Sequence, residues 1–328
     1  MKFLVTGASG FIGGHLCRGL LAAGHGVRAA CSAPERADVL RAMQTPALEL
    51  FRADHENAAA EQWQAACAGV DGVIHLAGRA HREETSEAAA ADCRRVNQEL
   101  ARVAEAAASA GVKSFMFVSS VAVYGLASPA GQAFTENSPA SPHPGAAYAV
   151  AKLEAENFLR APGVMAALAP IIVRPPLVYG AGVKGNMFSL LRLAALGLPL
   201  PLASIGNQRS FVGIHNLVDF LLCAATHTEA RGKTLLVSDA EDVSTPRLIH
   251  AIACGLGRKP RLFPLPPALL RAASAALGQR ARYGKLAGNF QIDPKDSFAL
   301  LNWRPQTAFA EGIHEMCDWF KKTGGVGG

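Results

Sequence analysis

Short apolar segments alternate with longer alanine-rich stretches of helical pattern through the first half of the chain. This alternation is typical of βαβ units, in which crossover helices join parallel strands. It predicts an α/β fold with a Rossmann-type, doubly wound parallel sheet. The predicted strands are residues 1–6, 27–32, 48–52, 72–76, 114–119 and 169–173, and two clear helices are 92–110 and 148–160.

A glycine-rich turn follows the first predicted strand and leads into an apolar periodic stretch that ends near Leu21. Gly7 permits a sharp turn, Gly10 permits a diphosphate to approach the main chain, and Gly13 permits close packing of helix and strand. The helix N-terminus offers N–H donors to phosphates. The spacing departs from the general Gly-x-Gly-x-x-Gly fingerprint, because the turn reads Gly7-Ala8-Ser9-Gly10-Phe11-Ile12-Gly13.

The regular alternation ends near Arg174, beyond which proline and glycine interrupt the pattern. We therefore expect a dinucleotide-binding domain at residues 1–174 and a smaller C-terminal substrate-binding domain at 175–328. Residues 234–238 resemble one more strand, and its return to the main sheet is left open.

Tyr148 and Lys152 lie four residues apart in a predicted helix, so their side chains share one face. A phenol can take a proton from an alcohol if its pKa falls from about 10 to near 7, which requires about 4 kcal/mol. A cation about 4 Å away, at an effective dielectric of about 20, supplies about 4 kcal/mol. The pair predicts a proton-transfer site for alcohol oxidation or ketone reduction.

The composition favours an intracellular enzyme without a metal. Half of the 328 residues are hydrophobic, which is enough for a substantial core. The seven cysteines form no Cys-x-x-Cys pair, which favours free thiols, a cytoplasmic location and no zinc site. The net charge of +6 is not gathered with stacking aromatic residues, so we expect phosphate-bearing small molecules rather than nucleic acid as partners.

No apolar run is long enough for a membrane span, and no stable membrane insertion is expected. Leu262–Leu277 is apolar but begins with three prolines and contains Arg271. We expect a packed helix there, with attachment to a membrane surface as the alternative.

Further motifs give the chain its resemblance to a known family. They are Asp54, His75-Leu76-Ala77-Gly78, Val96-Asn97, Phe117 to Gly125, Arg174-Pro175-Pro176-Leu177-Val178-Tyr179-Gly180 and Asn302-Trp303-Arg304-Pro305. With the glycine turn and the Tyr/Lys pair, they resemble the extended short-chain dehydrogenases/reductases, in particular the NAD(P)-dependent nucleotide-sugar epimerases, dehydratases and reductases.

The resemblance implies a catalytic set of Ser120, Tyr148 and Lys152, with Asn97 assisting the lysine. Ser120, with Ser119 as the fallback, is expected to bond the sugar oxygen, and Asn186 and Arg209 are expected to contact the diphosphate. Ordinary structural roles stay open for Ser120 and Arg209. The predicted cofactor-binding residues are Gly7, Gly10, Phe11, Ile12, Gly13, Ser32, Arg36, Asp54, Leu76, Ala77, Gly78, Tyr148, Lys152 and Pro175.

The end of the second predicted strand bears on the choice of cofactor. NAD-preferring relatives carry a carboxylate there, whereas this chain reads Cys31-Ser32. Ser32 and Arg36 can bind a 2′-phosphate, so we expect NADP or NAD, with NADP favoured.

The resemblance implies action at C4 of a UDP sugar and leaves several functions open. They are a 4-epimerase, which recycles its cofactor, and an NADPH-dependent 4-keto reductase of a UDP-4-keto-6-deoxy sugar. A dehydratase is less favoured because Val121-Ala122 follows Ser120 where an acid is usual, and a sensor without catalysis is remote because the Tyr/Lys pair is present. Relatives suggest a homodimer.

Overall fold

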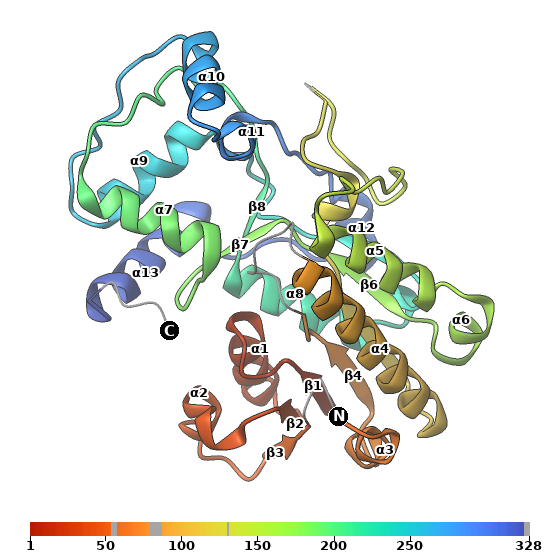
Figure 1. The fold of residues 1–328 in the computed structure, drawn as a ribbon. Helices are drawn as coiled ribbons and strands as arrows, with labels where there is room; N and C mark the ends of the chain where they lie inside the picture. Colours follow the sequence, from red (N-terminus) through yellow and green to blue (C-terminus); the bar gives the residue numbers. More distant parts are fainter. Residues whose placement is uncertain (54–57, 79–86, 130, 325–328) are drawn as a thin grey trace.

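The computed structural model describes residues 1–53, 58–78, 87–129 and 131–324. Its centre is a parallel sheet of seven strands in the order β3-β2-β1-β4-β5-β6-β9 (Figure 1). The predicted α/β fold is confirmed, and each predicted strand lies within two residues of an observed one. The strands are β1 (Lys2–Thr6), β2 (Gly26–Cys31), β3 (Leu48–Arg52), β4 (Gly72–His75), β5 (Ser114–Val118), β6 (Ile171–Arg174) and β9 (Thr234–Leu236).

Helices cover both faces of this sheet because both faces of its strands are apolar. Phe3 and Val5 of β1 pack into one buried cluster, whereas Leu4 between them packs into the other. The first face is covered by α1 (Phe11–Ala22), α2 (Asp38–Arg41), α8 (Ile214–Thr226) and α12 (Lys295–Leu301). The second is covered by α3 (Ala60–Cys67), α4 (Glu87–Ser109), α5 (Ala147–Leu159) and α6 (Pro162–Leu168).

The second half of the chain forms a smaller lobe with its own buried cluster around Tyr179 and Phe211. Its two strands, β7 (Leu177–Tyr179) and β8 (Phe211–Gly213), pair in parallel. Its helices are α7 (Gly185–Leu196), α9 (Thr245–Gly255), α10 (Pro267–Ala276), α11 (Arg280–Ala287) and α13 (Phe309–Lys322). Short 3-10 turns are η1 (Pro34–Arg36), η2 (Val121–Tyr124) and η3 (Thr228–Ala230).

The C-terminal apolar stretch does not pack as expected. None of the residues of α10, all of which the structure describes, is buried. The prolines delay the start of the helix to Pro267, and only Leu270 contacts the small cluster formed by Leu202, Ile205 and Ile249. The prediction of a packed helix is therefore wrong. Among the described residues, no helix has the length and apolar content needed to span a bilayer.

The parallel register sets the position of the candidate site. Because all seven strands point the same way, the segments after β1, β4, β5 and β6 meet at one edge of the sheet. These segments contain the glycine turn, Leu76–Gly78, Ser119–Ser120 and Pro175.

The glycine turn gives a stability test. A methyl group at Gly13 would lie 2.3 Å from the Gly7 carbonyl oxygen, so we expect Gly13→Ala to lower the free energy of unfolding by about 2 kcal/mol or more and to weaken dinucleotide binding. Urea unfolding and cofactor titration measure both effects. Gly163→Ala is the matched control, because nothing lies within 4 Å of the added methyl group there. Equal stability of the two variants would contradict the packing role of Gly13.

Candidate active site

The glycine turn forms a cradle that fits a diphosphate. Gly7 has a φ of +66°, which favours glycine, and a Cβ there would lie 3.0 Å from the Ala77 nitrogen of the loop after β4. Gly10 precedes α1 directly, and among the described residues no side chain caps this helix. Its first N–H groups therefore remain oriented toward the turn, as anion binding requires. Phe11 and Ile12, both half-buried, form the first turn of α1.

The loop after β4 is tied to the end of β1. The Leu76 N–H donates to the Thr6 carbonyl oxygen at 3.3 Å, and the Ala77 N–H donates to the Thr6 hydroxyl at 3.3 Å. Ala77 is buried and Gly78 is exposed, so this loop turns outward beside the glycine turn. The predicted cofactor residues of the glycine turn and of Leu76–Gly78 thus come together from two adjacent strands.

Lys152 is the most constrained of the predicted catalytic residues. It is buried in α5, and its ammonium donates to the Val118 carbonyl oxygen at 2.9 Å. The same ammonium lies 4.4 Å from the centre of the Phe117 ring and 5.8 Å from the centre of the Tyr148 ring. The end of β5 therefore fixes the lysine one helical turn from the phenol.

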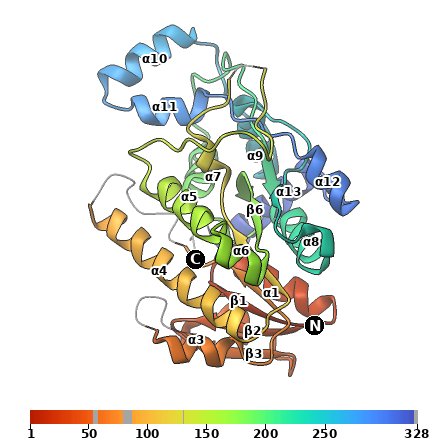
Figure 2. The ribbon, with the colours of Figure 1, turned by 90° about the vertical axis from the view of Figure 1, so that its right-hand side faces the viewer.

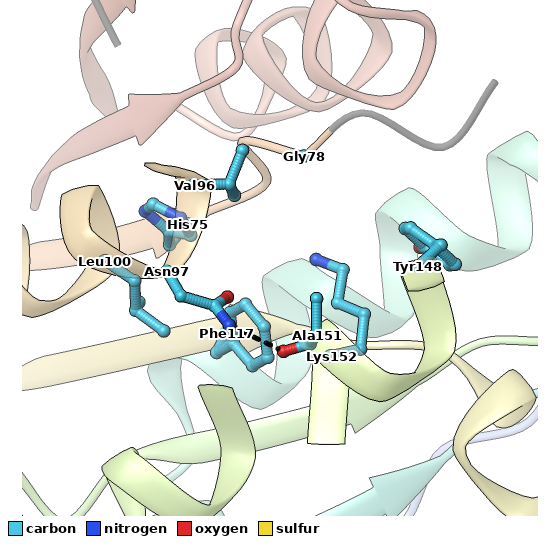
Figure 3. A pocket seen from close by; sticks show the side chains of 9 residues that line it. All are labelled: His75, Gly78, Val96, Asn97, Leu100, Phe117, Tyr148, Ala151 and Lys152. Carbon is cyan, nitrogen blue, oxygen red and sulfur yellow. Dashed lines mark hydrogen bonds between the residues drawn. The ribbon is translucent and has the colours of Figure 1, made fainter. Parts of the chain in front are cut away.

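Tyr148 is half-buried in the first turn of α5 and lines a small pocket between β4, β5, α4 and α5 (Figure 3). In Figure 3 the Lys152 ammonium lies on the same side of α5 as the Tyr148 ring. The pocket is lined by His75, Gly78, Val96, Asn97, Leu100, Phe117, Tyr148, Ala151 and Lys152.

Asn97 joins α4 to the catalytic helix. Its amide donates to the Ala151 carbonyl oxygen at 3.1 Å and to the Glu154 carboxylate at 3.2 Å. Because Ala151 precedes Lys152, this bond holds the backbone of α5 next to the lysine.

The two serines after β5 differ in their surroundings. Ser120 is half-buried, and its hydroxyl oxygen accepts a hydrogen bond from the Ala122 N–H at 3.2 Å. A hydroxyl that accepts in this way keeps its proton for another partner. Ser119 is buried, and its hydroxyl donates to the Glu156 carboxylate at 2.5 Å. The Ser120 proton is therefore available to a ligand, whereas the Ser119 proton is already bonded to Glu156.

The sequence reasoning missed a buried carboxylate on α5 itself. Glu156 accepts hydrogen bonds from Arg174 Nε at 2.9 Å and Nη2 at 2.5 Å, and it forms an ion pair with Arg160 Nη1 at 2.9 Å. Its position four residues after Lys152, on the face shared with Tyr148, was the available signal. Burial by itself would raise the pKa of Glu156, but the bonds from Arg174 and Ser119 and the charge of Arg160 hold that pKa below its usual value.

The end of β2 lies beside a basic residue that the sequence analysis did not name. Ser32 is exposed, and Arg52, the last residue of β3, donates to its carbonyl oxygen at 3.4 Å and pairs with Glu35 at 2.6 Å. Register places Arg52 beside Cys31, which the sequence spacing did not reveal. Asp54 and the side chain of Arg36 lie outside the described residues.

The remaining predicted residues lie on separate elements. Pro175, just after β6, is buried, and its carbonyl accepts from the Val121 N–H at 3.1 Å. Asn186 is exposed in the first turn of α7. Arg209 is half-buried, and its Nη1 donates to the carbonyl oxygens of Lys285 and Gly288 at 2.9 and 3.1 Å.

Comparison with known proteins identifies the family. The family model described as "NAD dependent epimerase/dehydratase family" matches residues 3–237. The chain belongs to the NAD dependent epimerase/dehydratase family. This epimerase/dehydratase chain is 33% identical over 324 residues to a UDP-glucose 4-epimerase of Vibrio cholerae, with 97% of this chain and 95% of the relative covered.

Solved structures agree with this assignment. The UDP-glucose 4-epimerase of Thermus thermophilus in complex with NAD has a TM-score of 0.76 and 26% identity, covering 98% of this chain and 99% of that one. The UDP-glucuronic acid 4-epimerase of Bacillus cereus, bound to UDP-glucuronic acid and NAD, shares the fold with a TM-score of 0.79 at 20% identity, covering 98% and 100%. The epimerase/dehydratase chain is therefore a nicotinamide-dinucleotide-dependent enzyme.

The Glu156 cluster gives the second test. Glu156→Gln would leave the buried Arg174 guanidinium without its counter-charge, so we expect the free energy of unfolding at pH 7 to fall by about 3 kcal/mol. Glu105→Gln, the same change at an exposed position of α4, should cost less than about 0.5 kcal/mol.

The pH dependence follows from the lowered pKa of Glu156. A carboxylate whose pKa is lower in the folded state stabilises the protein above its unfolded pKa of about 4.3 and loses this effect as the pH falls through the folded value. The stability gap between wild type and Glu156→Gln should therefore narrow below about pH 4. Urea unfolding at several pH values measures it, and a gap independent of pH would contradict the assignment.

Proposed function

We propose that this enzyme acts at C4 of a UDP sugar by reversible hydride transfer, as a UDP-hexose 4-epimerase. The observation that carries the proposal is the disposition of α5, which holds the Lys152 ammonium on the Val118 carbonyl one turn from Tyr148. The similarity to a UDP-glucose 4-epimerase of Vibrio cholerae along nearly the whole chain supports the choice of substrate class.

In this proposal the phenolic oxygen of Tyr148 takes the proton of the C4 hydroxyl and returns it when the ketone is reduced. A nicotinamide dinucleotide held by the glycine turn and the loop after β4 would supply the acceptor and donor for the hydride of C4. The Lys152 ammonium favours the phenolate electrostatically, while Ser120 donates its proton to the sugar oxygen. Asn97 and Glu156 position the helix and do not touch the reacting atoms.

The diphosphate of the sugar nucleotide is assigned to Arg209 and Asn186. Among the described residues no carboxylate pairs with Arg209, and burial lowers the pKa of its guanidinium. A half-buried cation that donates to neutral carbonyls favours an anionic ligand. Asn186 would add an amide donor from the first turn of α7.

A second candidate is an NADPH-dependent 4-keto reductase of a UDP-4-keto-6-deoxy sugar. It is favoured by the end of β2, where exposed Ser32 replaces a carboxylate and the Arg52 guanidinium lies alongside. A reductase consumes hydride and is better served by NADPH, whereas an epimerase recycles its cofactor. Dehydration is less favoured because the residues after Ser120 are Val121 and Ala122, which offer no acid.

The decisive experiment incubates the purified protein with UDP-glucose, UDP-N-acetylglucosamine and a UDP-4-keto-6-deoxy sugar, with each nicotinamide form. We expect exchange of C4 isomers without net cofactor turnover. Stoichiometric loss of NADPH with the ketone would instead identify the reductase.

Tyr148→Phe serves as the mechanistic control in the same assay. We expect its turnover to fall by a factor of about 10²–10⁴, because the proton-transfer group is removed. Cofactor binding should persist, since the change deletes one oxygen from a half-buried ring. Wild-type turnover in this variant would exclude Tyr148 as the base.

The cofactor preference is tested at Arg52. If its guanidinium binds a 2′-phosphate, Arg52→Met should raise the Kd for NADP about tenfold and change the Kd for NAD less than about twofold. Fluorescence titration measures both constants. Arg192→Met, at an exposed position of α7, is the control and should change neither. Equal effects of Arg52→Met on both cofactors would refute the NADP preference.

A homodimer is also proposed, by analogy with relatives that pack two long helices from each subunit. The candidates are α4 and α5, which contact each other along the second face of the sheet.

A further inference from the structure

The net positive charge of this chain arises in one segment. Residues 243–292 contain eight arginines and lysines and no aspartate or glutamate. The rest of the chain carries 24 basic and 26 acidic residues, so the whole net charge of +6 arises from this segment. Such an excess of positive charge attracts anionic partners.

The same segment exposes apolar side chains on α10 and the loop before it. Leu269 is 58% exposed, Leu277 after the helix is 74% exposed, and Phe263 is 44% exposed. Ala272, Ala273 and Ala276 share the outward side of α10 and are exposed as well. The outward half of the helix therefore presents apolar atoms to the solvent.

A second apolar segment lies beside it. Leu200 pairs with Leu262 in an isolated bridge, and the Phe263 N–H donates to the Leu200 carbonyl oxygen at 3.0 Å. Leu196 and Leu198, just before this bridge, are 66% and 54% exposed. Nine large hydrophobic side chains are exposed among the described residues, and five belong to this α10 surface: Leu196, Leu198, Phe263, Leu269 and Leu277.

Basic side chains border the α10 surface. Arg258, Lys259, Arg261 and Arg271 are all exposed, and residues 196–205 carry no charge. The surface lies at the end of the molecule opposite β1–β3, as both ribbon views show (Figures 1 and 2). It is therefore separate from the cofactor cradle at the start of α1.

We propose that the α10 surface binds peripherally to anionic phospholipid bilayers. Apolar side chains on one side of a helix, bordered by lysine and arginine, suit the boundary between headgroups and acyl chains. Exposed apolar side chains on neighbouring segments are typical of an interaction site. The bilayer is favoured over a second copy of this chain, because the exposed basic side chains that border the surface, Arg258, Lys259, Arg261 and Arg271, would repel their symmetry mates. The inference does not depend on which sugar the enzyme uses.

The test is cosedimentation of the full-length protein with vesicles. Wild type should bind vesicles of equal parts phosphatidylcholine and phosphatidylglycerol at least about tenfold more tightly than pure phosphatidylcholine vesicles. Leu269→Glu/Leu277→Glu should lose this binding, whereas Val39→Glu/Leu126→Glu, at sites 54% and 55% exposed, should retain it.

Two double variants that remove basic charges test whether vesicle binding depends on electrostatic attraction or on non-specific apolar adsorption. Arg258→Gln/Lys259→Gln should weaken binding several-fold, whereas Lys113→Gln/Lys233→Gln, which removes two exposed charges at the amino ends of β5 and β9, should not. Circular dichroism confirms folding of each variant. Absence of vesicle binding, equal binding to neutral vesicles, or retention of binding by Leu269→Glu/Leu277→Glu would overturn the proposal. Loss of a lipid-independent dimer in that variant, with no vesicle binding by wild type, would identify a second copy as the occupant.

Discussion

The position of α5 depends on the hydrogen bonds and the ion pairs of the buried Glu156 carboxylate. It is fully buried, accepts hydrogen bonds from Arg174 at the end of β6 and from Ser119 after β5, and forms an ion pair with Arg160 at the end of α5. A buried charge is tolerated only where its partners are fixed, so each of these bonds restricts the others. Two strand ends and one helix are thereby held in a single arrangement.

The Glu156 cluster is connected to Lys152 and Tyr148 through their regular spacing on α5. Tyr148, Lys152 and Glu156 follow one another at intervals of four residues and so lie along one side of the helix. Arginines neutralise Glu156, which lies deepest, and the Val118 carbonyl holds Lys152 in the middle. Tyr148 is outermost and lies half-buried at the pocket. The row thus runs from a carboxylate through an ammonium to a phenol, and in the proposed mechanism the ammonium favours the phenolate form of Tyr148.

The sequence predicts the strands and the glycine turn well because both depend on local pattern. The prediction of β3 at residues 48–52 is confirmed, and Gly7 and Gly13 make the close contacts that their spacing implied. The first strand and the turn together fix where a dinucleotide can lie.

Contacts between distant segments are harder to predict. Arg52 reaches Ser32 only through the register of β2 and β3, and Ser119 meets Glu156 only after α5 has packed on β5. The apolar composition of residues 262–277 suggested burial, yet a ten-residue helix that begins at the third of three prolines contacts a buried cluster through one leucine. The apolar composition of a segment indicates that its burial would be favourable. The length and the starting residue of its helix decide whether it can contact an apolar surface of the protein.

The acid-free segment at residues 243–292 connects two features that sequence pattern treats separately. Arg209 bonds to the carbonyls of Lys285 and Gly288, which belong to this segment, and a carboxylate introduced there would neutralise its guanidinium. Among the described residues, no carboxylate forms an ion pair with the exposed Arg258, Lys259 or Arg261. Because unpaired charge acts over about 10 Å at moderate ionic strength, one compositional constraint on this segment would serve both the proposed diphosphate at Arg209 and the proposed anionic bilayer outside the lobe.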